Sequence, residues 1–578
     1  MTYRMYGMCV GAALAVAGCI GPHEPDQTTL LTYQKGLIRE GPLRRADEKT
    51  PLGLMRPMGE PGVGELPTRP GSISTLDANG AIVARKVTLV DLSLEEVIHR
   101  TLANSPEIRV ASFDPGIARQ DVIKAAAAFD PVLFATWELN EEDKARTVLD
   151  SGLPEQIWKN KGTAGIKQHL PTGADVQLDW GLTRQRTTGQ PPLGSTTRPT
   201  VIDYEQTLSL TIKQPLLRDA GCDVNLATLR VARINRDISD QAFRDKVEQT
   251  VGTAIAGYYA LQGARRNVEI QESLLKATDE TLRKVIARGP LDATDVHVKQ
   301  TEAALESRRA SLLSAQKAFY DAQDKLARTL DDKKINLLDD YVIVPTTPLA
   351  EAPVKLSVGD QLGTALQYSP LLAQARMAIQ SAGISIDVAK NQLLDRLDLT
   401  ASATVQGLGK TWHLSSEALE TRDHVGYDIG LSWEHPLGNR EAKSNLDKAK
   451  LQKDKAVATL QDLASQVAVV VRERVRQVET THRQLAQQGK AVTALEVQLR
   501  AMELTEQEMG RLTPEWLSLK LQAQESLAGA RSAQTQAAVD YNTAIINLAQ
   551  VTGTVLHLPR LKIALPAATG EALGPGAP

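Results

Sequence analysis

An apolar stripe of helical period runs through the sequence between Pro436 and Pro514. Its members follow one another at steps of three, four and seven residues, a spacing that is typical of a helix packed along another helix. They are Leu460, Leu463, Val467, Val471, Val475, Val478, Leu485, Val492, Leu495, Leu499 and Met502. No further proline interrupts the stretch from Pro215 to Pro290. Since about 70 helical residues span roughly 105 Å, both stretches predict long helices that must lie along other helices.

Shorter helices are predicted before and after the long ones. Ser93 and Ser357 are favourable N-caps, and an acidic side chain follows each of them three residues later, as in a capping box. The Ser-Pro pairs at 105–106 and 369–370 interrupt these helices, because proline disfavours a helical conformation in the residue before it. The interrupted helices resume and end near Ala128 and Leu394, and the helices that follow the long ones cover about 292–331 and 513–553.

Between the shorter and the long helices, apolar and polar residues alternate instead. This alternation is typical of strands that present one face to an apolar environment. The predicted strands are 132–140, 164–170, 174–180, 204–212, 397–405 and 425–433. All but one of the Trp residues lie in these two regions. Strands of about ten residues with interfacial aromatics suggest a transmembrane barrel wall, although a soluble sandwich alternates in a similar way.

The order of these elements occurs twice along the chain. Leu92–Ile98 resembles Leu356–Leu362, and the two Ser-Pro pairs have the same separation in sequence. Three further pairs share a shorter separation: Gln214-Pro215-Leu216 with His435-Pro436-Leu437, Gly289 with Gly510, and Tyr320 with Tyr541. A constant separation means that helical register is kept in both halves, so the sequence predicts two copies of one unit.

The change of separation places an insertion in the first copy, between Pro106 and Gln214. Residues 166–180 in this interval predict an additional hairpin around the turn Pro171-Thr172-Gly173. Two arrangements are compatible with the sequence. The chain has six strands in one wall, or it has four strands there and a hairpin folded outside the wall.

The N-terminus has the pattern of a secretion signal. Arg4 precedes an apolar run that is too short to span a membrane, and the run ends in Val16-Ala17-Gly18-Cys19. This ending resembles the bacterial lipobox, which implies a signal peptide over 1–18 and a lipid on Cys19; the alternative is an ordinary signal peptide with a chance cysteine. Lipidation favours the membrane barrel over the sandwich. Residues 19–88, rich in Pro, Gly and charge, predict a flexible tether, and 557–578 form a low-complexity tail.

Composition and motifs give no sign of an enzyme or of a cofactor. Aromatic residues make up 4% of the chain and the net charge is -3, which favours long helices over thick cores and gives no reason to expect nucleic acid. The nine His residues are scattered, so no metal-ligand motif is predicted. Gly409-Lys410-Thr411 lacks the earlier glycine of a phosphate loop, since position 404 is Thr. We interpret it as a surface turn at a strand end, and not as a connection from a strand to a helix.

Taken together, these features resemble the outer-membrane efflux protein family, the TolC-like channels. The resemblance rests on the paired helix starts with their Ser-Pro breaks, on the Gln-Pro-Leu and His-Pro-Leu strand ends, and on the Gly turns at 289 and 510. It covers about 90–555. The implied domains are a first repeat over 89–350, with its β segments at 130–213, and a second repeat over 351–556, with its β segments at 397–436.

The resemblance implies a mainly α fold with β: tandem repeats whose antiparallel strands join a trimeric transmembrane β-barrel and whose coiled-coil helices join a periplasmic α-helical barrel. The implied protein is a lipid-anchored homotrimer in the outer membrane. It is a passive exit duct for substrates that an inner-membrane transporter delivers through a periplasmic adaptor, in efflux or type I secretion. The alternative is an envelope-spanning coiled-coil lipoprotein without a pore. The cargo cannot be inferred from the sequence.

The same resemblance assigns roles to two turns. In the family, the corresponding turns form the periplasmic tip and contact the adaptor, which would involve Gly289, Pro290, Gly510, Thr513, Pro514 and Trp516. Asp292 and Asp295 are candidates for a ring of carboxylates at the aperture. A simpler interpretation makes Asp292 or Thr513 an N-cap, with Asp295 as the capping partner of Asp292 and Pro514 at the first helical position.

Overall fold

The chain divides into two units, Met1–Gly62 and Val63–Pro578. The computed structural model describes residues 66–76, 82–143, 154–189, 198, 200–288, 295–338, 340–422, 424–509 and 513–556, all of which belong to the second unit. The predicted signal peptide, Cys19 and the low-complexity tail lie outside the described residues. Among the helices that are described, none has an apolar segment sufficient to cross a membrane.

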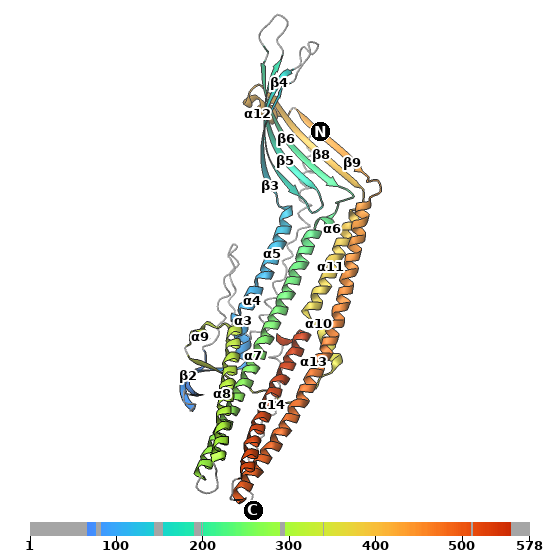
Figure 1. Ribbon diagram of the computed structural model, residues 1–578. Helices are drawn as coiled ribbons and strands as arrows, with labels where there is room; N and C mark the ends of the chain where they lie inside the picture. The colour runs from blue at the N-terminus through green and yellow to red at the C-terminus, as the bar shows by residue number, and fades with distance from the viewer. Residues whose placement is uncertain are drawn as a thin grey trace, which may run out of the picture. The chain divides into compact units, whose positions relative to one another are not determined.

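Helices make up most of the described residues, and in each half shorter helices precede the strands of the six-stranded sheet and a long helix follows them (Figure 1). The first half contains α3 (Leu94–Asn104), α4 (Pro106–Ala111), α5 (Phe113–Ala126), the 3-10 turn η2 (Ala127–Phe129), α6 (Cys222–Asn225), α7 (Ala227–Ala287), α8 (Asp295–Leu330) and α9 (Lys333–Asn336). The second half contains α10 (Val358–Tyr368), α11 (Pro370–Asn391), α12 (Trp412–Thr421), α13 (Arg440–Met509) and α14 (Pro514–Thr552).

The predicted helix starts are confirmed. Ser93 accepts a hydrogen bond from the backbone N–H of Glu96 at 3.2 Å, and the Glu96 carboxylate accepts one from the backbone N–H of Ser93 at 2.9 Å. Ser357 accepts from the backbone N–H of Asp360 at 3.4 Å. Both Ser-Pro pairs separate two helices, with the proline at the first position of α4 and of α11. The ends of these helices are therefore set by local contacts of the caps and by the prolines.

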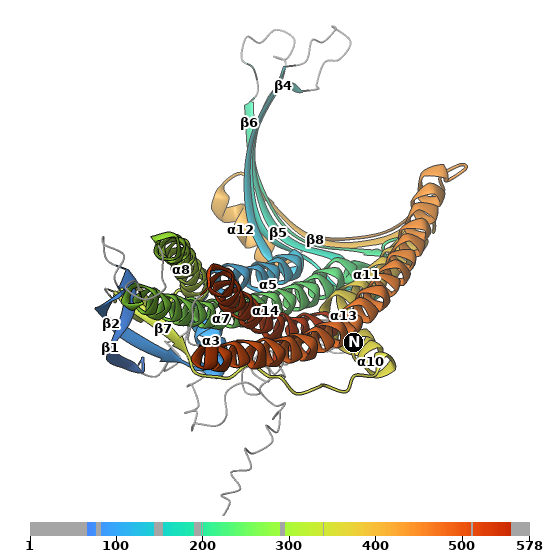
Figure 2. The ribbon, with the colours of Figure 1, turned by 60° about the horizontal axis from the view of Figure 1, so that its bottom comes forward.

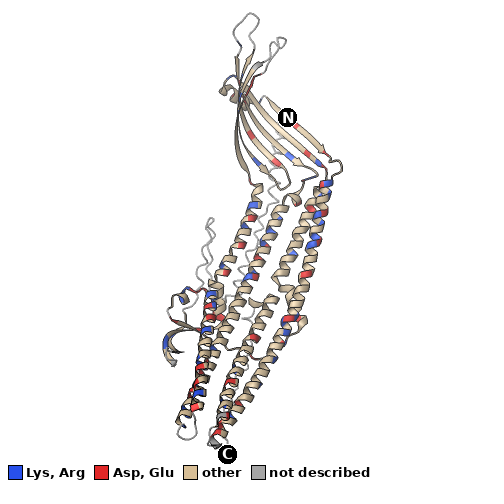
Figure 3. Ribbon diagram, in the orientation of Figure 1, with Lys and Arg blue, Asp and Glu red and all other residues tan. Residues whose placement is uncertain are grey.

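Each long helix packs along a partner from its own half. α7 contacts α8, α13 contacts α14, and α7 also contacts α14, which joins the two halves. The core of α13 is the predicted stripe, with Val471, Val475 and Val478 almost fully buried. Lys, Arg, Asp and Glu are interspersed along the helices (Figure 3), as expected where one narrow face of a helix is buried.

Six antiparallel strands form one sheet. They are β3 (Val132–Asp143), β4 (Pro154–His169), β5 (Asp175–Gly189), β6 (Thr200–Pro215), β8 (Arg396–Gly409) and β9 (Val425–Glu434), in that spatial order. The additional hairpin β4–β5 pairs with β3 on one side and with β6 on the other. It is thus part of the sheet rather than folded outside it, and the described residues contribute six strands to this sheet.

A second, three-stranded sheet was not predicted. β1 (Thr68–Leu76) pairs antiparallel with β2 (Ile82–Leu92), and β2 pairs parallel with β7 (Tyr341–Pro345). The prediction of a flexible tether up to residue 88 is therefore wrong over these strands. The physical reason is a long-range one: β2 is stabilised by pairing with β7, and Val90 and Leu92 are fully buried by that packing.

Two tyrosine hydroxyls bind the segment that connects β7 to α10, and thereby the first half of the chain to the second. Tyr258 of α7 donates to the Leu92 carbonyl at 3.1 Å and accepts from the Thr347 N–H at 2.9 Å. Tyr541 of α14 donates to the Ala352 carbonyl at 2.7 Å and accepts from the Val354 N–H at 3.2 Å. The segment after β7 therefore lies fixed along the helices of both halves.

Candidate functional site

The six-stranded sheet has one apolar and one polar face. The pairing register and the alternation of side chains place on one face Leu133, Ala135, Trp137, Ala164, Ile166, Leu178, Trp180, Leu208, Leu210, Ile212, Ala401, Ala403, Val405, Tyr427, Ile429, Leu431 and Trp433. On β9 these side chains are largely exposed: Ile429 is 79% and Leu431 is 65% accessible.

The opposite face is lined by hydroxyl, amide and charged groups. It carries Thr136, Glu138, Lys161, Thr163, Lys167, Gln177, Asp179, Thr183, Glu205, Thr207, Ser209, Thr211, Lys213, Ser402, Thr404, Gln406 and Asp428. A large number of exposed apolar side chains on a single face indicates a surface that contacts lipid or another protein rather than water. A wall that separates lipid from an aqueous lumen needs this combination of faces.

The short helix α12 packs on the apolar face, against β8 and β6. A Cβ atom at Gly407 would lie 2.2 Å from the Ser415 carbonyl oxygen, and one at Gly409 would lie 2.5 Å from the Ser415 nitrogen. Only glycine permits this close approach. The Thr411 side chain accepts from the Leu414 N–H at 3.5 Å and caps the helix. Gly409-Lys410-Thr411 therefore connects strand β8 to helix α12, so the prediction that it does not lead from a strand into a helix is wrong.

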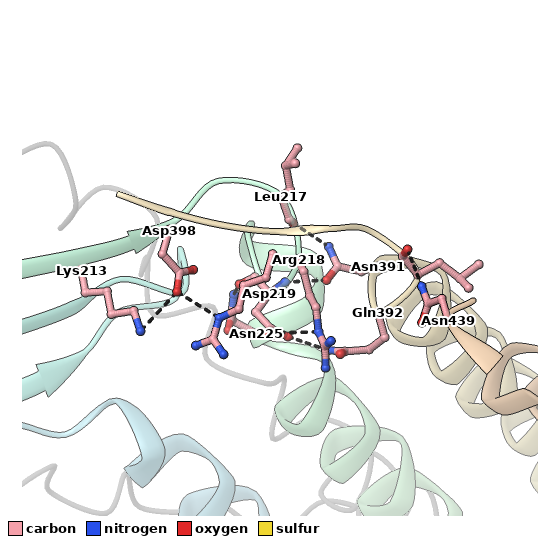
Figure 4. Close-up of polar contacts among 11 residues, drawn as sticks. Lys213, Leu217, Arg218, Asp219, Asn225, Asn391, Gln392, Asp398 and Asn439 are labelled. Carbon is pink, nitrogen blue, oxygen red and sulfur yellow. Dashed lines mark hydrogen bonds and ion pairs between the residues drawn. The ribbon is translucent and has the colours of Figure 1, made fainter. Parts of the chain in front are cut away.

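A network of polar side chains fixes the junction between the sheet and the helices (Figure 4). Asn391, the last residue of α11, accepts from the backbone N–H of Asp219 at 2.7 Å and donates to the Leu217 carbonyl at 3.3 Å. The Gln392 side-chain amide donates to the Asp219 carboxylate at 2.5 Å. Asn225 of α6 donates to the Asp219 carbonyl at 2.9 Å. The segment that leads from β6 into the long helix is thus tied to the helix of the other half.

Charged groups continue this network on the polar face of the sheet. Asp398 is 4% exposed and pairs with Lys213 at 3.2 Å and with Arg396 at 3.0 Å. Just before β8, the Asp395 carboxylate lies 2.7 Å from Nδ1 of His435 and accepts from the Trp433 indole at 3.2 Å. The hydrogen bond with His435 lowers the pKa of Asp395 below its ordinary value. The pair of Asp398 with Lys213 joins β8 to β6, and the pair of Asp395 with His435 joins the start of β8 to the end of β9.

The described part of the tip contains four of the predicted residues, Asp295, Thr513, Pro514 and Trp516. Asp295 is exposed and is the first residue of α8. Thr513 caps α14 by accepting from the Trp516 N–H at 3.3 Å, and Pro514 occupies the first turn, as the simpler interpretation predicts. Gly289, Pro290, Asp292 and Gly510 lie outside the described residues, so the aperture and adaptor assignments stay predictions.

A buried arginine joins three helices beyond the tip. Arg308 of α8 is 5% exposed; it donates to the Leu521 carbonyl at 2.7 Å, to the Gln524 side-chain oxygen at 3.2 Å and to the Thr278 hydroxyl. Burial lowers the pKa of this guanidinium. Closer to the tip, Leu517 and Leu521 of α14 pack on Val285 of α7. The two helical hairpins are therefore held together by an apolar cluster and by a polar network.

The sequence interpretation missed Arg308, the helix α12 and Gln206, whose side-chain amide donates to the hydroxyls of Ser415 and Ser416 on α12. A detectable signal existed for Gln206, since it occupies an apolar-face position in the alternation of β6. No comparable signal marks Arg308, because a lone arginine in an amphipathic helix normally faces water. Within the described residues, no group of three His, Cys, Asp or Glu side chains could hold a metal ion.

Comparison with known proteins identifies the fold. No protein-family model and no curated protein sequence matches the chain. Solved structures do match. The CmeC outer membrane channel of Campylobacter jejuni aligns at 15% identity with a TM-score of 0.56, over 80% of this chain and 85% of CmeC. The outer membrane protein VceC of Vibrio cholerae aligns at 17% identity with a TM-score of 0.55, over 80% of this chain and 96% of VceC.

A third match, the MtrE outer membrane channel of Neisseria gonorrhoeae in its open state, has 16% identity and a TM-score of 0.54. It covers 80% of this chain and 89% of MtrE. The chain therefore has the fold of the outer-membrane efflux channels, as the repeated motifs predicted. The similarity extends over nearly the whole length of each of these channels, so both halves of the chain belong to the match.

Proposed function

We propose that the chain is the outer-membrane channel subunit of a tripartite efflux or type I secretion system, and that three copies enclose one continuous duct. The observation that carries this proposal is a pair of matching open edges. On one edge β3 follows α5, and on the other edge β9 precedes α13. Along the row of helices between them, α5 contacts α7, α7 contacts α11, and α11 contacts α13.

Both edges present unpaired strands and apolar side chains. On α4 and α5, Val110, Phe113 and Ile117 are between 56% and 69% exposed, and on α13 Leu451 is 68% exposed. β3 and β9 each have one described neighbour in the sheet. Because an unpaired strand edge is intolerable in lipid, the sheet must close on itself or on further copies. The strands alternate in direction, so β9 of one copy can pair antiparallel with β3 of the next.

The mechanism that follows is passive. The polar face of the sheet lines the lumen, the apolar face contacts lipid, and the helices continue the duct into the periplasm. Transport then requires an inner-membrane transporter as the energy source and a periplasmic adaptor at the tip. The alternative, a coiled-coil rod without a pore, gives no reason for a sheet with an apolar exposed face.

The decisive test combines oligomeric state with conductance. Purified protein in detergent is expected to be trimeric and to conduct ions in planar bilayers. The double variant Phe113→Glu and Ile117→Glu should lose the trimer, because it places charge in the proposed contact between copies. Lys86→Glu, an exposed charge change outside both edges, should keep it. A soluble non-conducting monomer contradicts the proposal, and a trimer without conductance favours the rod.

The tip is the proposed site of gating and of adaptor contact. Asp295 is exposed at the start of α8, and three such carboxylates around an axis would attract cations and repel one another. Asp292 would add to this ring. Asp295→Asn should lower the cation selectivity of the channel, whereas Lys299→Gln, on the same helix face, should not. Adaptor contact is assigned to Gly289, Pro290, Gly510, Thr513, Pro514 and Trp516, and Trp516→Ala should weaken it.

Lipidation is proposed for Cys19, after removal of residues 1–18. The support is the Val16-Ala17-Gly18-Cys19 sequence directly after an apolar run. Cells grown with labelled palmitate should label the wild-type protein and leave Cys19→Ser unlabelled. Labelling of Cys19→Ser at the wild-type level would contradict this assignment while leaving the channel proposal intact.

A further inference from the structure

The apolar face of the sheet changes character along one row of paired residues. Trp137, Gly162, Leu182, Gln206 and Gly407 lie opposite one another on adjacent strands. In the next rows towards the helices, every side chain on this face is apolar or aromatic. In the other direction polar and amphipathic side chains appear on it, namely Asn160, Arg184, Tyr204, Trp158 and Arg186, together with Leu139 and Ile202. The row therefore marks the end of the apolar band.

The helix α12 lies over this row and provides the hydrogen-bond partners of its one amide side chain, Gln206. The Gln206 amide is 3% exposed and donates to the hydroxyls of Ser415 at 3.1 Å and Ser416 at 2.8 Å. Its carbonyl oxygen accepts from the Trp180 indole at 3.4 Å. In the absence of α12, this polar side chain would face outward at the border of the apolar band. Figure 2 shows α12 on the outer, convex side of the curved sheet.

Exposed aromatic and basic groups surround α12. Trp412 is 47% and Leu414 is 51% exposed, and the Trp412 ring lies 6.0 Å from that of Trp180 in an edge-to-face arrangement. Arg184 and Arg186 are exposed, and the Arg184 guanidinium lies 5.9 Å from the Tyr204 ring. Aromatic side chains with arginines beside them match the chemistry of a bilayer interface, where acyl chains meet phosphate headgroups.

We propose that an outer collar, formed by Trp158, Arg184, Arg186, Tyr204, Trp412 and Leu414, binds the phosphate headgroups of the surrounding bilayer lipids, with α12 embedded at headgroup depth. This inference rests on the proposed channel function. The depth follows from the helix itself: Glu417 and Glu420 are exposed and exclude the hydrocarbon core, whereas Trp412 and Leu414 favour contact with the upper acyl chains. Arginine suits phosphate because its planar fork can donate two parallel hydrogen bonds.

The first experiment measures the depth of α12. In a Cys222→Ser background, bimane is attached to Leu414→Cys, to Leu210→Cys on the apolar face or to Ser209→Cys on the polar face. Trimers are reconstituted in phosphatidylcholine vesicles with lipids that carry a doxyl quencher at a shallow or a deep acyl position. The Leu414 label should lose most of its emission to the shallow quencher. The Leu210 label should respond to the deep quencher, and the Ser209 label to aqueous iodide alone.

The outcomes separate the collar from the channel. A Leu414 label quenched by iodide alone, with the other two labels as expected, overturns the collar and leaves the channel proposal standing. Labels at Leu210 and Ser209 that do not differ overturn the channel proposal itself. Quenching of the Leu414 label chiefly from the deep position also overturns the collar, since it would place α12 in the hydrocarbon core.

The second experiment tests the recognition of phosphate charge. Brominated phosphatidylglycerol at a minor fraction in phosphatidylcholine should quench Trp emission more strongly than the same fraction of brominated phosphatidylcholine. The double variant Arg184→Gln and Arg186→Gln should abolish this difference. The matched control, Lys159→Gln and Lys161→Gln on the polar face, should preserve it. Equal quenching by the two lipids in the unaltered protein, or a difference that survives the arginine changes, overturns the proposed headgroup binding.

Discussion

Leu312 in α8 is fully buried against its own chain, packed with Leu275 and Leu305, whereas Ile429 on β9 is 79% exposed. The helices bury their apolar stripes on one another within a single copy. The sheet leaves its apolar face uncovered and keeps its polar side chains on the other face. The helical region is thus stabilised mainly by the chain itself, and the sheet by the surroundings it is proposed to occupy.

The largest effect is expected for a substitution in the helical region. Leu312→Ala should lower the free energy of unfolding by about 2–5 kcal/mol, because it removes a fully buried side chain and leaves a cavity. Leu313→Ala changes the next residue, which is 53% exposed, and should cost far less. Thermal unfolding in detergent, followed by the loss of helical circular dichroism, measures both. Equal losses would mean that the helices are not stabilised by this core.

A charged side chain on the apolar face of the sheet tests whether this face contacts lipid. Ile429→Arg should destabilise the protein in lipid vesicles by about 2–4 kcal/mol, the cost of arginine near the middle of a bilayer. Asp428→Arg places the same side chain on the polar face and should be much milder. Urea unfolding of vesicle-reconstituted protein compares the two. If both substitutions are tolerated equally, the apolar face does not contact lipid.

A substitution of the buried Arg308 tests how much the contacts between the two helical hairpins contribute to stability. Arg308→Gln should cost about 1.5–3 kcal/mol, since the hydrogen bonds of a charged group to α7 and α14 are lost. Arg309→Gln serves as the matched control, because Arg309 pairs with Glu306 on its own helix. Melting temperatures in detergent should fall clearly for the first variant and little for the second. Similar shifts would assign no special role to the inter-hairpin network.

The smallest expected effect is a pH dependence at the junction of the two regions. The pKa of Asp395 is lowered in the folded protein by its hydrogen bond with His435. Its contribution to stability is therefore fully present above the unfolded pKa of about 3.9 and is lost as the pH falls through the lower folded value. Asp395→Asn should flatten the fall in melting temperature between about pH 5 and pH 2. An unchanged profile would mean that other carboxylates control acid unfolding.

Local signals were sufficient to predict the helical region. Ser93 and Ser357 cap their helices through contacts three residues away, and the stripe through Val471 and Val475 specifies which face of α13 is buried. Alternation likewise revealed the six strands. The strand count stayed open because alternation does not say which strands are neighbours. Only the pairing of β4 with β3 and of β5 with β6 decides it.

The missed elements depend on partners that are distant in sequence. β2 pairs with β7, and Thr88 lies opposite Tyr341. The hairpin of β2 with β1 is local in sequence, but the Pro-, Gly- and charge-rich composition around it gives no clear strand signal. α12 contains 10 residues, which is too short to be stable alone, and it forms where Gly407 allows it to approach the sheet. At the tip, sequence correctly predicted the cap at Thr513. The proposed roles of Asp295 and Trp516 depend on other chains, which the sequence of this chain does not contain.

The β4–β5 hairpin has a consequence for how the duct is closed. Each copy brings α5, α7, α11 and α13 to the row of helices, so a proposed trimer has twelve helices and eighteen strands. Twelve helices about 10 Å apart enclose a ring of roughly 120 Å. Twelve strands about 4.8 Å apart would have to slant by roughly 60° to match that ring, whereas eighteen match it at roughly 45°. The added hairpin thus adjusts the perimeter of the wall to that of the helices, and steeper strands make its apolar belt taller.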